Sequence, residues 1–246
     1  MQILFLIVFL LEGFSVIAGI YYIRRKPNDI DNKLLTYFLF LTVCIEIVGL
    51  IPAIIYNHEA LHYLKDTVWY TNFWLYNPFI IVSFAAYAFY FRMSLENKIS
   101  RKILSYLIVI FVISSSLNLF FLDDFFNSYS IFNLFMGVAL LFLAVSFYYY
   151  ELLQDETLLY INRSVKFYVS VAILLFNLIS MPLWIYMKFY NNTLSMEFVN
   201  LYTIVFRIAN ILLYCTYIFA FIYCAKGRSI SKNLGDLKFT KIKPID

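Results

Sequence analysis

Residues 3–26 read ILFLIVFLLEGFSVIAGIYYIRRK. Residues 3–23 contain no Lys or Arg, and Glu12 is their one acidic side chain. A helix needs about 20 predominantly apolar residues to cross a hydrocarbon layer of about 30 Å. No basic segment precedes this stretch, no small-residue cleavage motif follows it, and Glu12 interrupts its apolar run. We therefore interpret it as a retained transmembrane helix rather than a signal peptide.

Six further stretches of similar length and hydropathy follow, at residues 35–57, 69–91, 102–122, 129–150, 165–188 and 199–224. Only 14% of the 246 residues are charged, whereas a soluble domain carries about 25%. Each run is longer than the roughly 9–11 residues of a membrane β-strand. Helices also satisfy their own backbone hydrogen bonds in lipid. The sequence predicts an all-α integral membrane bundle of seven transmembrane helices.

The basic residues divide unequally between the two sides of this bundle. Of 19 Lys and Arg residues, 16 lie on one side, in segments 24–33, 92–102, 151–166 and 226–246. The loops of the other side hold Lys65 and Lys188 only, and Arg207 lies within the seventh helix. Because basic loops stay in the cytoplasm, the N-terminus is expected outside and the C-terminus inside.

The chain divides into a seven-helix transmembrane domain, residues 1–225, and a basic cytoplasmic tail, residues 226–246. We attribute the net charge of +4 to topology and to contact with anionic lipid headgroups, not to nucleic-acid binding. The tail is expected either to lie against lipid or to dock on a cytoplasmic partner.

Three ionisable residues lie deep within the apolar runs, namely Glu12, Glu46 and Arg207. Each is roughly 8–11 residues from the outer end of its helix, so we expect them at a similar depth. A charge there costs about 2.5–3.5 kcal/mol unless it meets a partner or water. An Arg that bridges two carboxylates would use most of its donors, which predicts that the first, second and seventh helices are neighbours.

Amides at comparable depth extend this set into a polar belt, with Asn77 in the third helix, Asn177 in the sixth and Asn210 in the seventh. Two interpretations remain open. The charged residues form a buried triad that only fixes helix order, or the belt lines a pocket for a small ligand, an ion or a proton.

The only two histidines of the chain lie in the string HEALH, residues 58–62. On a helix, this pattern places two imidazoles on one zinc ion and a glutamate beside its water. Here the string falls in a short outer loop, without a recognisable motif for a third ligand. Ordinary loop histidines are the leading interpretation; a non-catalytic metal site or a metalloprotease at His58 and His62 are the alternatives.

Two known seven-helix classes do not fit the sequence. Retinal proteins need a Lys in the seventh helix, and Lys226 lies beyond it, so no retinal is expected. Seven-helix zinc hydrolases use three membrane histidines, more than the two present. Small sugar transporters remain possible, since Pro52 and Pro182 occupy similar positions in the two halves.

Three strings carry a family resemblance: IEI at residues 45–47, FYYYELL at 147–153 and NILLY at 210–214. With them the chain resembles the short, uncharacterised seven-helix inner-membrane proteins of Bacteroidetes-type bacteria. Those proteins are in turn similar to the seven-helix sensor modules that are fused to histidine kinases. The resemblance implies a multi-pass protein of the bacterial inner membrane with a signalling role.

The leading hypothesis is a receptor-like or sensor membrane subunit. It would bind a small ligand in its outer half and signal through a separate cytoplasmic or membrane partner, such as a histidine kinase. The alternatives are a small-solute or proton-coupled transporter, and a structural subunit of a membrane complex. The sequence indicates no reaction and no cofactor.

Overall fold

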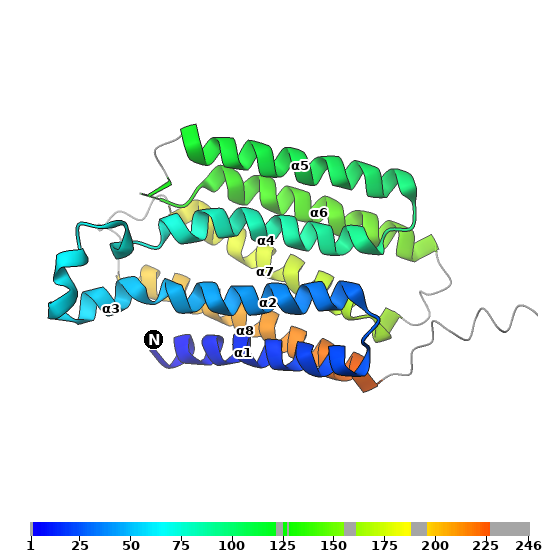
Figure 1. Cartoon of the computed structure of the whole chain (residues 1–246), viewed down its shortest axis with the longest axis horizontal. Coiled ribbons are helices and arrows are strands. Elements are labelled where there is room, and N and C mark those ends of the chain that lie inside the picture. Colours follow the sequence, from blue (N-terminus) through cyan, green and yellow to red (C-terminus); the bar gives the residue numbers. More distant parts are fainter. Residues whose placement is uncertain (1, 122–124, 127, 155–160, 188–195, 227–246) are drawn as a thin grey trace, which may run out of the picture.

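The computed structural model describes residues 2–121, 125–126, 128–154, 161–187 and 196–226, and every regular element among them is helical. In chain order these are α1 (Gln2–Arg25), α2 (Ile30–Gly49), α3 (Ile51–Asn57), η1 (Glu59–Leu64), η2 (Val68–Tyr70), α4 (Phe73–Ser94), α5 (Lys98–Phe121), α6 (Ile131–Gln154), α7 (Val165–Met187) and α8 (Met196–Lys226) (Figure 1). Here η1 and η2 are short 3-10 helices. Seven spans are long and apolar enough to cross a membrane, with α2 and α3 in one span. The expected all-helical bundle is confirmed for the described residues.

The observed helices differ from the predicted apolar runs by a few residues at their ends. The largest difference is at α2, which begins at Ile30 rather than at residue 35. The Asp29 carboxylate accepts a hydrogen bond from the Asn32 backbone N–H, at 3.2 Å, and so satisfies one free donor of the first turn. Hydropathy alone does not register such a cap.

Six of the long helices form a closed ring in which each packs against two neighbours. The order around the ring is α1, α2, α4, α6, α7 and α8, and α8 returns to α1. The predicted contacts of the first helix with the second and the seventh, α1 with α2 and α8, are confirmed. Helix α5 packs on α4 and α6 and lies at one edge of the bundle, opposite α1 (Figure 1).

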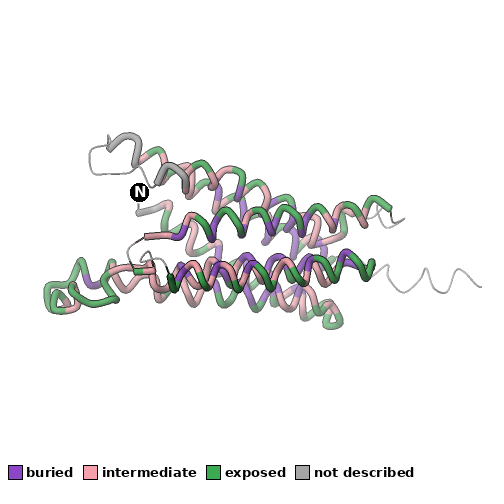
Figure 2. The backbone as a smooth tube through the Cα atoms, turned by 90° about the horizontal axis from the view of Figure 1, so that it is seen from above, coloured by how far each residue is buried: buried purple, intermediate pink, exposed green. Residues whose placement is uncertain are grey.

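Large apolar side chains cover the outside of the bundle as well as its interior. Phe120, Leu178 and Ile17 are 86%, 72% and 61% exposed. Figure 2 shows exposed residues along the outward faces of the helices and buried residues along the inward faces. A soluble monomer rarely exposes so much apolar surface. The helices are therefore suited to a lipid environment, as in a multi-pass membrane protein.

The two ends of the bundle differ. The end at which α1 begins, called the N-terminal end below, carries α3, η1 and η2, which project from the bundle (Figures 1 and 2). At the opposite end, where α1 finishes at Arg25, residues 26–29 join α1 to α2 and residues 95–97 join α4 to α5.

Close contact between α4 and α6 depends on Gly137. A Cβ atom at this position would collide with the ring of Phe84, which is held edge-on against Phe111 at a centroid distance of 6.3 Å. We expect Gly137→Ala to lower the free energy of unfolding by about 1–3 kcal/mol, because the ring cannot move aside without disturbing its neighbour. The measurement is thermal unfolding of the purified protein in detergent, followed by circular dichroism.

The matched control is Gly13→Ala. A Cβ atom at Gly13 meets nothing within 4 Å, and Ala is a better helix former than Gly. The control should melt at or slightly above the wild-type temperature. Equal effects of the two substitutions would contradict the close approach of α4 and α6.

Candidate functional site

Two carboxylates from different helices lie together inside the bundle. Glu12 of α1 is 5% exposed, and Glu46 of α2 is half-buried. The two groups interact electrostatically across the α1–α2 contact. Among the described residues, the one ion pair recorded joins Lys166 to Asp31, so no described Lys or Arg neutralises either glutamate at close range.

Tyrosine hydroxyls take the place of cationic partners. The Tyr76 hydroxyl of α4 donates to Glu46 Oε2 at 2.9 Å. The Tyr214 hydroxyl of α8 lies close enough to Glu12 for the two side chains to interact. Four helices, α1, α2, α4 and α8, thus meet at the carboxylate pair. A tyrosine suits this position because its ring is apolar and only its hydroxyl needs a polar partner.

A break in the second membrane span makes room for Tyr76. Helix α2 ends at Gly49, and α3 starts with Pro52 in its first turn, where proline cannot donate a hydrogen bond back to the preceding turn. The Tyr76 hydroxyl lies so close to Gly49 that a Cβ atom there would collide with it. Asn72 Nδ2 also donates to the Gly49 carbonyl, at 3.0 Å. The glycine therefore allows α4 to reach Glu46.

Aromatic rings from four segments, α4, the α5–α6 connection, α7 and α8, form a wall beside the carboxylates. The Tyr129 ring lies 5.0 Å from Phe73, 6.4 Å from Tyr76 and 5.2 Å from Trp184, between ring centroids. Trp184 lies in turn 5.7 Å from Phe206. These five residues are called the aromatic wall below. Most of the contacts are edge-on, the arrangement that ring quadrupoles favour.

Tyr129 is the member of the aromatic wall that lies between two helices, α5 and α6. Burial and the nearby Glu46 carboxylate raise the pKa of Tyr129 to about 12. A tyrosine hydroxyl keeps its proton at neutral pH even at its ordinary pKa of about 10, so Tyr129 can act as a donor toward this region. Nothing in the sequence distinguishes this residue from the other tyrosines, because the chain contains 22 of them.

Buried tyrosines continue from the carboxylate pair toward the opposite end. The Tyr214 ring contacts Tyr217 at 6.2 Å, and the Tyr217 hydroxyl donates to the Tyr87 hydroxyl at 3.1 Å. One turn further along α4, the Tyr90 hydroxyl donates to Asn32 Oδ1 at 2.7 Å. These residues, Tyr214, Tyr217, Tyr87, Tyr90 and Asn32, are called the tyrosine file below. They connect α8, α4 and α2 through the centre of the bundle.

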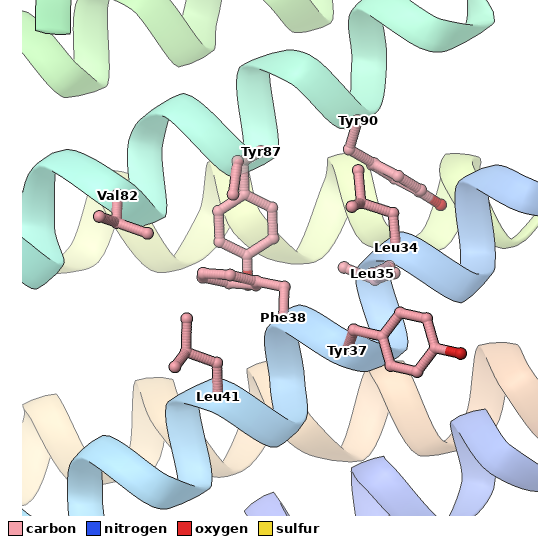
Figure 3. Close-up of a pocket in the computed structure, with 9 residues that line it drawn as sticks. Leu34, Leu35, Tyr37, Phe38, Leu41, Val82, Tyr87 and Tyr90 are labelled. Atoms are coloured by element: carbon pink, nitrogen blue, oxygen red, sulfur yellow. The ribbon is translucent and has the colours of Figure 1, made fainter.

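An apolar groove between α2 and α4 reaches the side of the tyrosine file. Its volume is about 280 Å³, and Tyr87 and Tyr90 line it together with apolar side chains such as Leu34, Phe38 and Val82 (Figure 3). The polar surface in its lining is very small, so the groove itself is not a polar binding site.

At the opposite end of the bundle, the tyrosine file ends in a network of hydrogen bonds. The Tyr22 hydroxyl and Asn32 Nδ2 donate to the same oxygen, Asp29 Oδ2, at 2.7 and 2.8 Å. The adjacent Asp31 forms an ion pair with Lys166 of α7. Asp29 thus joins the end of α1 to the start of α2, and Asp31 adds α7.

Arg207 lies nearer the N-terminal end than the carboxylate pair does. Its guanidinium carbon is 6.0 Å from the centroid of the Phe5 ring. Helices α1 and α8 run in parallel, with Phe5 beside Arg207 and Glu12 beside Tyr214. Seven residues separate each pair along its helix, which corresponds to about 10 Å. The structure therefore brings Glu12 and Glu46 together and places Arg207 two turns away, so the predicted bridge by Arg207 stays a prediction.

The three predicted belt amides donate hydrogen bonds to backbone carbonyls. Asn77 Nδ2 donates to the carbonyls of Phe125 and Ser128, at 3.1 and 2.9 Å, and anchors the connection between α5 and α6 on α4. Asn177 and Asn210 each donate to the carbonyl four residues earlier in the same helix, at 2.8 and 2.9 Å. A ligand-binding role for these amides stays a prediction.

His58 and His62 are exposed at the projecting end of the molecule. His58 is extended and precedes η1, and His62 lies within that 3-10 helix. Because a 3-10 helix has 3.0 residues per turn, residues four apart do not share a face. Within the described residues, no group of three or more His, Cys, Asp or Glu side chains is close enough to hold a metal ion.

Comparisons of the chain with protein-family models, with curated proteins and with solved structures give no match. The chemistry of the carboxylate pair and of its surroundings therefore carries the functional proposal.

The hydrogen bond between Tyr76 and Glu46 can be isolated by a double-mutant cycle of Tyr76→Phe and Glu46→Gln. We expect a coupling energy of about 0.5–2 kcal/mol, the range found for hydrogen bonds between membrane helices. The measurement is the free energy of unfolding of the four proteins in one detergent. As a control, Tyr37, which is 67% exposed on α2, is changed to Phe and paired with Glu46→Gln. Equal coupling in the two cycles would contradict a direct bond from Tyr76.

Proposed function

We propose that this chain is a receptor-like sensor subunit that binds a small cation at Glu12 and Glu46 and signals through a separate partner. The observation that carries the proposal is the pair itself, because two carboxylates on different helices interact electrostatically inside an apolar bundle, and the one ion pair recorded among the described residues lies elsewhere. A charge at this depth is costly when it is alone, and a second negative charge beside it adds repulsion. A bound cation or proton removes both costs.

The surroundings of the pair favour a cation with some apolar surface. The aromatic wall, Phe73, Tyr76, Tyr129, Trp184 and Phe206, presents ring faces and edges near Glu46. Ring faces attract cations, and quaternary ammonium groups are the ligands that proteins most often hold in this way. A carboxylate beside aromatic rings therefore supports an organic ammonium ion as the class of ligand.

The tyrosine file supports a route from this site to the other end of the bundle. A cation between Glu12 and Glu46 competes for the hydroxyls of Tyr76 and Tyr214, which belong to α4 and α8. The same two helices are joined again by Tyr217 and Tyr87. Binding therefore biases the relative positions of α4 and α8 along their length, as a differential contact must do to shift a conformational equilibrium.

We place the N-terminal end of the bundle outside the cell and the opposite end in the cytoplasm of a bacterial inner-membrane protein. Support comes from the 16-to-2 distribution of Lys and Arg between the two sides and from the family resemblance. In this orientation the carboxylate pair lies in the outer half, and the Asp29 network faces a cytoplasmic partner such as a histidine kinase.

Cation binding can be tested with the purified protein and tetramethylammonium chloride, with sodium chloride at equal ionic strength as the reference. We expect tetramethylammonium to raise the melting temperature, by roughly 5 °C or more once its concentration is a hundred times the dissociation constant. Glu46→Gln and Glu12→Gln should each abolish this increase, because the ligand loses half of its carboxylate pair.

The matched control is Glu59→Gln, which removes an exposed carboxylate at the same end of the bundle and should leave the increase unchanged. An equal increase with sodium would overturn the organic ammonium ion as ligand and keep the cation site. No increase with either salt, or an increase that survives both site substitutions, would overturn the cation site itself.

A second candidate function is proton-coupled or cation-coupled transport. It is favoured by the tyrosine file, because hydroxyl groups extend from the carboxylate pair toward Asp29 at the other end. Transport requires access from both ends, whereas a sensor requires access from one end only.

Proteoliposomes that enclose a pH-sensitive dye distinguish the two functions. For a sensor we expect an imposed gradient of tetramethylammonium or sodium to drive no proton movement above that of empty liposomes. Proton movement that Glu46→Gln abolishes and Glu59→Gln leaves intact would contradict the sensor function and support transport.

A further inference from the structure

A second groove lies between α1 and α8, at the opposite end from the carboxylate pair. Its volume is about 620 Å³, and its walls are formed by Phe14, Ile17, Ala18, Tyr21, Ile218 and Ile222. Ala18 is 5% exposed and Phe14 is 53% exposed. A small floor residue between larger side chains thus leaves a channel that is open toward the outside of the bundle.

Among the described residues that line or flank this groove, the basic groups lie at one end. Lys226, the last residue of α8, lines the groove itself. Arg25 stacks on Tyr21, another lining residue, with its guanidinium carbon 4.7 Å from the ring centroid. The register that pairs Glu12 with Tyr214 brings Arg25 to the level of Lys226. Two exposed cations therefore flank the mouth of an apolar channel.

We propose that this groove binds one anionic phospholipid, with an acyl chain between α1 and α8 and the headgroup phosphate between Arg25 and Lys226. The charge of the mouth matches a phosphate, and guanidinium and ammonium groups are its usual partners in proteins. The apolar walls match an acyl chain. The acyl chain of a zwitterionic lipid also fits the apolar walls, but its headgroup places a further positive group beside Arg25 and Lys226.

The length of the groove fits a single leaflet. Phe14 and Arg25 are eleven residues apart on α1, which corresponds to about 16 Å of helix. Half of a hydrocarbon core of about 30 Å is about 15 Å. A chain whose phosphate lies at Arg25 therefore ends near Phe14. A bound lipid at this position buries the open side of the α1–α8 contact, on the two helices that also carry Glu12 and Tyr214.

Native mass spectrometry of the full chain in detergent tests this site. The purified protein is titrated with phosphatidylglycerol and, separately, with phosphatidylcholine of the same acyl chains. We expect the first phosphatidylglycerol to bind at least five-fold more tightly than phosphatidylcholine. Lys226→Gln and Arg25→Gln should each weaken phosphatidylglycerol binding roughly five-fold and leave phosphatidylcholine binding unchanged.

The matched control is Lys102→Gln. Lys102 is exposed at the same end of the bundle, and its ammonium group lies 5.9 Å from the ring centroid of Tyr106 on α5. Its substitution should leave the lipid preference unchanged. Ala18→Leu fills the floor of the groove and should weaken both lipids. If that variant does not fold, Ile222→Ala, which widens the wall at an exposed position, should instead alter the preference for acyl-chain length.

Several results would overturn the proposal. Equal affinity for the two lipids, or an equal effect of Lys102→Gln and Lys226→Gln, means that the protein attracts anionic lipid only through its general positive charge. Glycerol phosphate lacks acyl chains. If it binds as tightly as phosphatidylglycerol, the apolar groove does not contribute to binding. If the protein is a dimer and Ala18→Leu dissociates it, the groove holds a second copy of the chain and not a lipid.

Discussion

A pair of carboxylates inside an apolar helix bundle constrains the arrangement of the helices around it. In lipid, no bulk water can solvate Glu12 and Glu46, so every neighbouring helix that reaches them must contribute a polar group. Helices α4 and α8 do so through Tyr76 and Tyr214. The rotation of both helices about their axes follows from this requirement, because a tyrosine turned toward lipid would leave the glutamate without its donor. Without Glu12 and Glu46, neither Tyr76 nor Tyr214 would need to direct its hydroxyl to this part of the bundle.

The same requirement explains why tyrosine, rather than a stronger donor, recurs along the interior. Apolar packing in lipid gives helices little preference for one register over another. A tyrosine ring packs as a phenylalanine ring does, but its hydroxyl must also reach one particular oxygen on a neighbouring helix. This hydrogen bond favours one register of the two helices. Tyr217 with Tyr87, and Tyr90 with Asn32, fix α4 against α8 and α2 in this way. Cationic donors would require a counter-charge at each level.

The sequence predicts the spans, but of the contacts between them it predicts only those of α1 with α2 and α8. Apolar length is a property of each segment alone, so the seven helices and the unusual depth of Glu12 and Glu46 follow from reading one segment at a time. Which faces meet depends on the rotation and register of pairs of helices. Hydropathy therefore did not distinguish Tyr76 or Tyr214 among 22 tyrosines, nor indicate that Arg207 lies beside Phe5. The position of α5 outside the ring is likewise a property of the whole bundle.

The two ends of the bundle are built for different degrees of movement. At the N-terminal end, the second span is interrupted at Leu50, and the short helix α3 leads into the 3-10 helices η1 and η2, in which no residue is buried. Short 3-10 helices break more readily than long helices do. At the opposite end, Tyr22, Asp29, Asn32 and Tyr90 are joined by hydrogen bonds of 2.7–2.8 Å. Opening that end requires several buried bonds to break together, each worth about 0.6 kcal/mol on average between membrane helices. At the N-terminal end, α2 and α4 are joined by the hydrogen bonds from Tyr76 to Glu46 and from Asn72 to the Gly49 carbonyl. The proposed sensor requires access to the carboxylate pair from one end only, whereas transport would also require the Asp29 network at the other end to open.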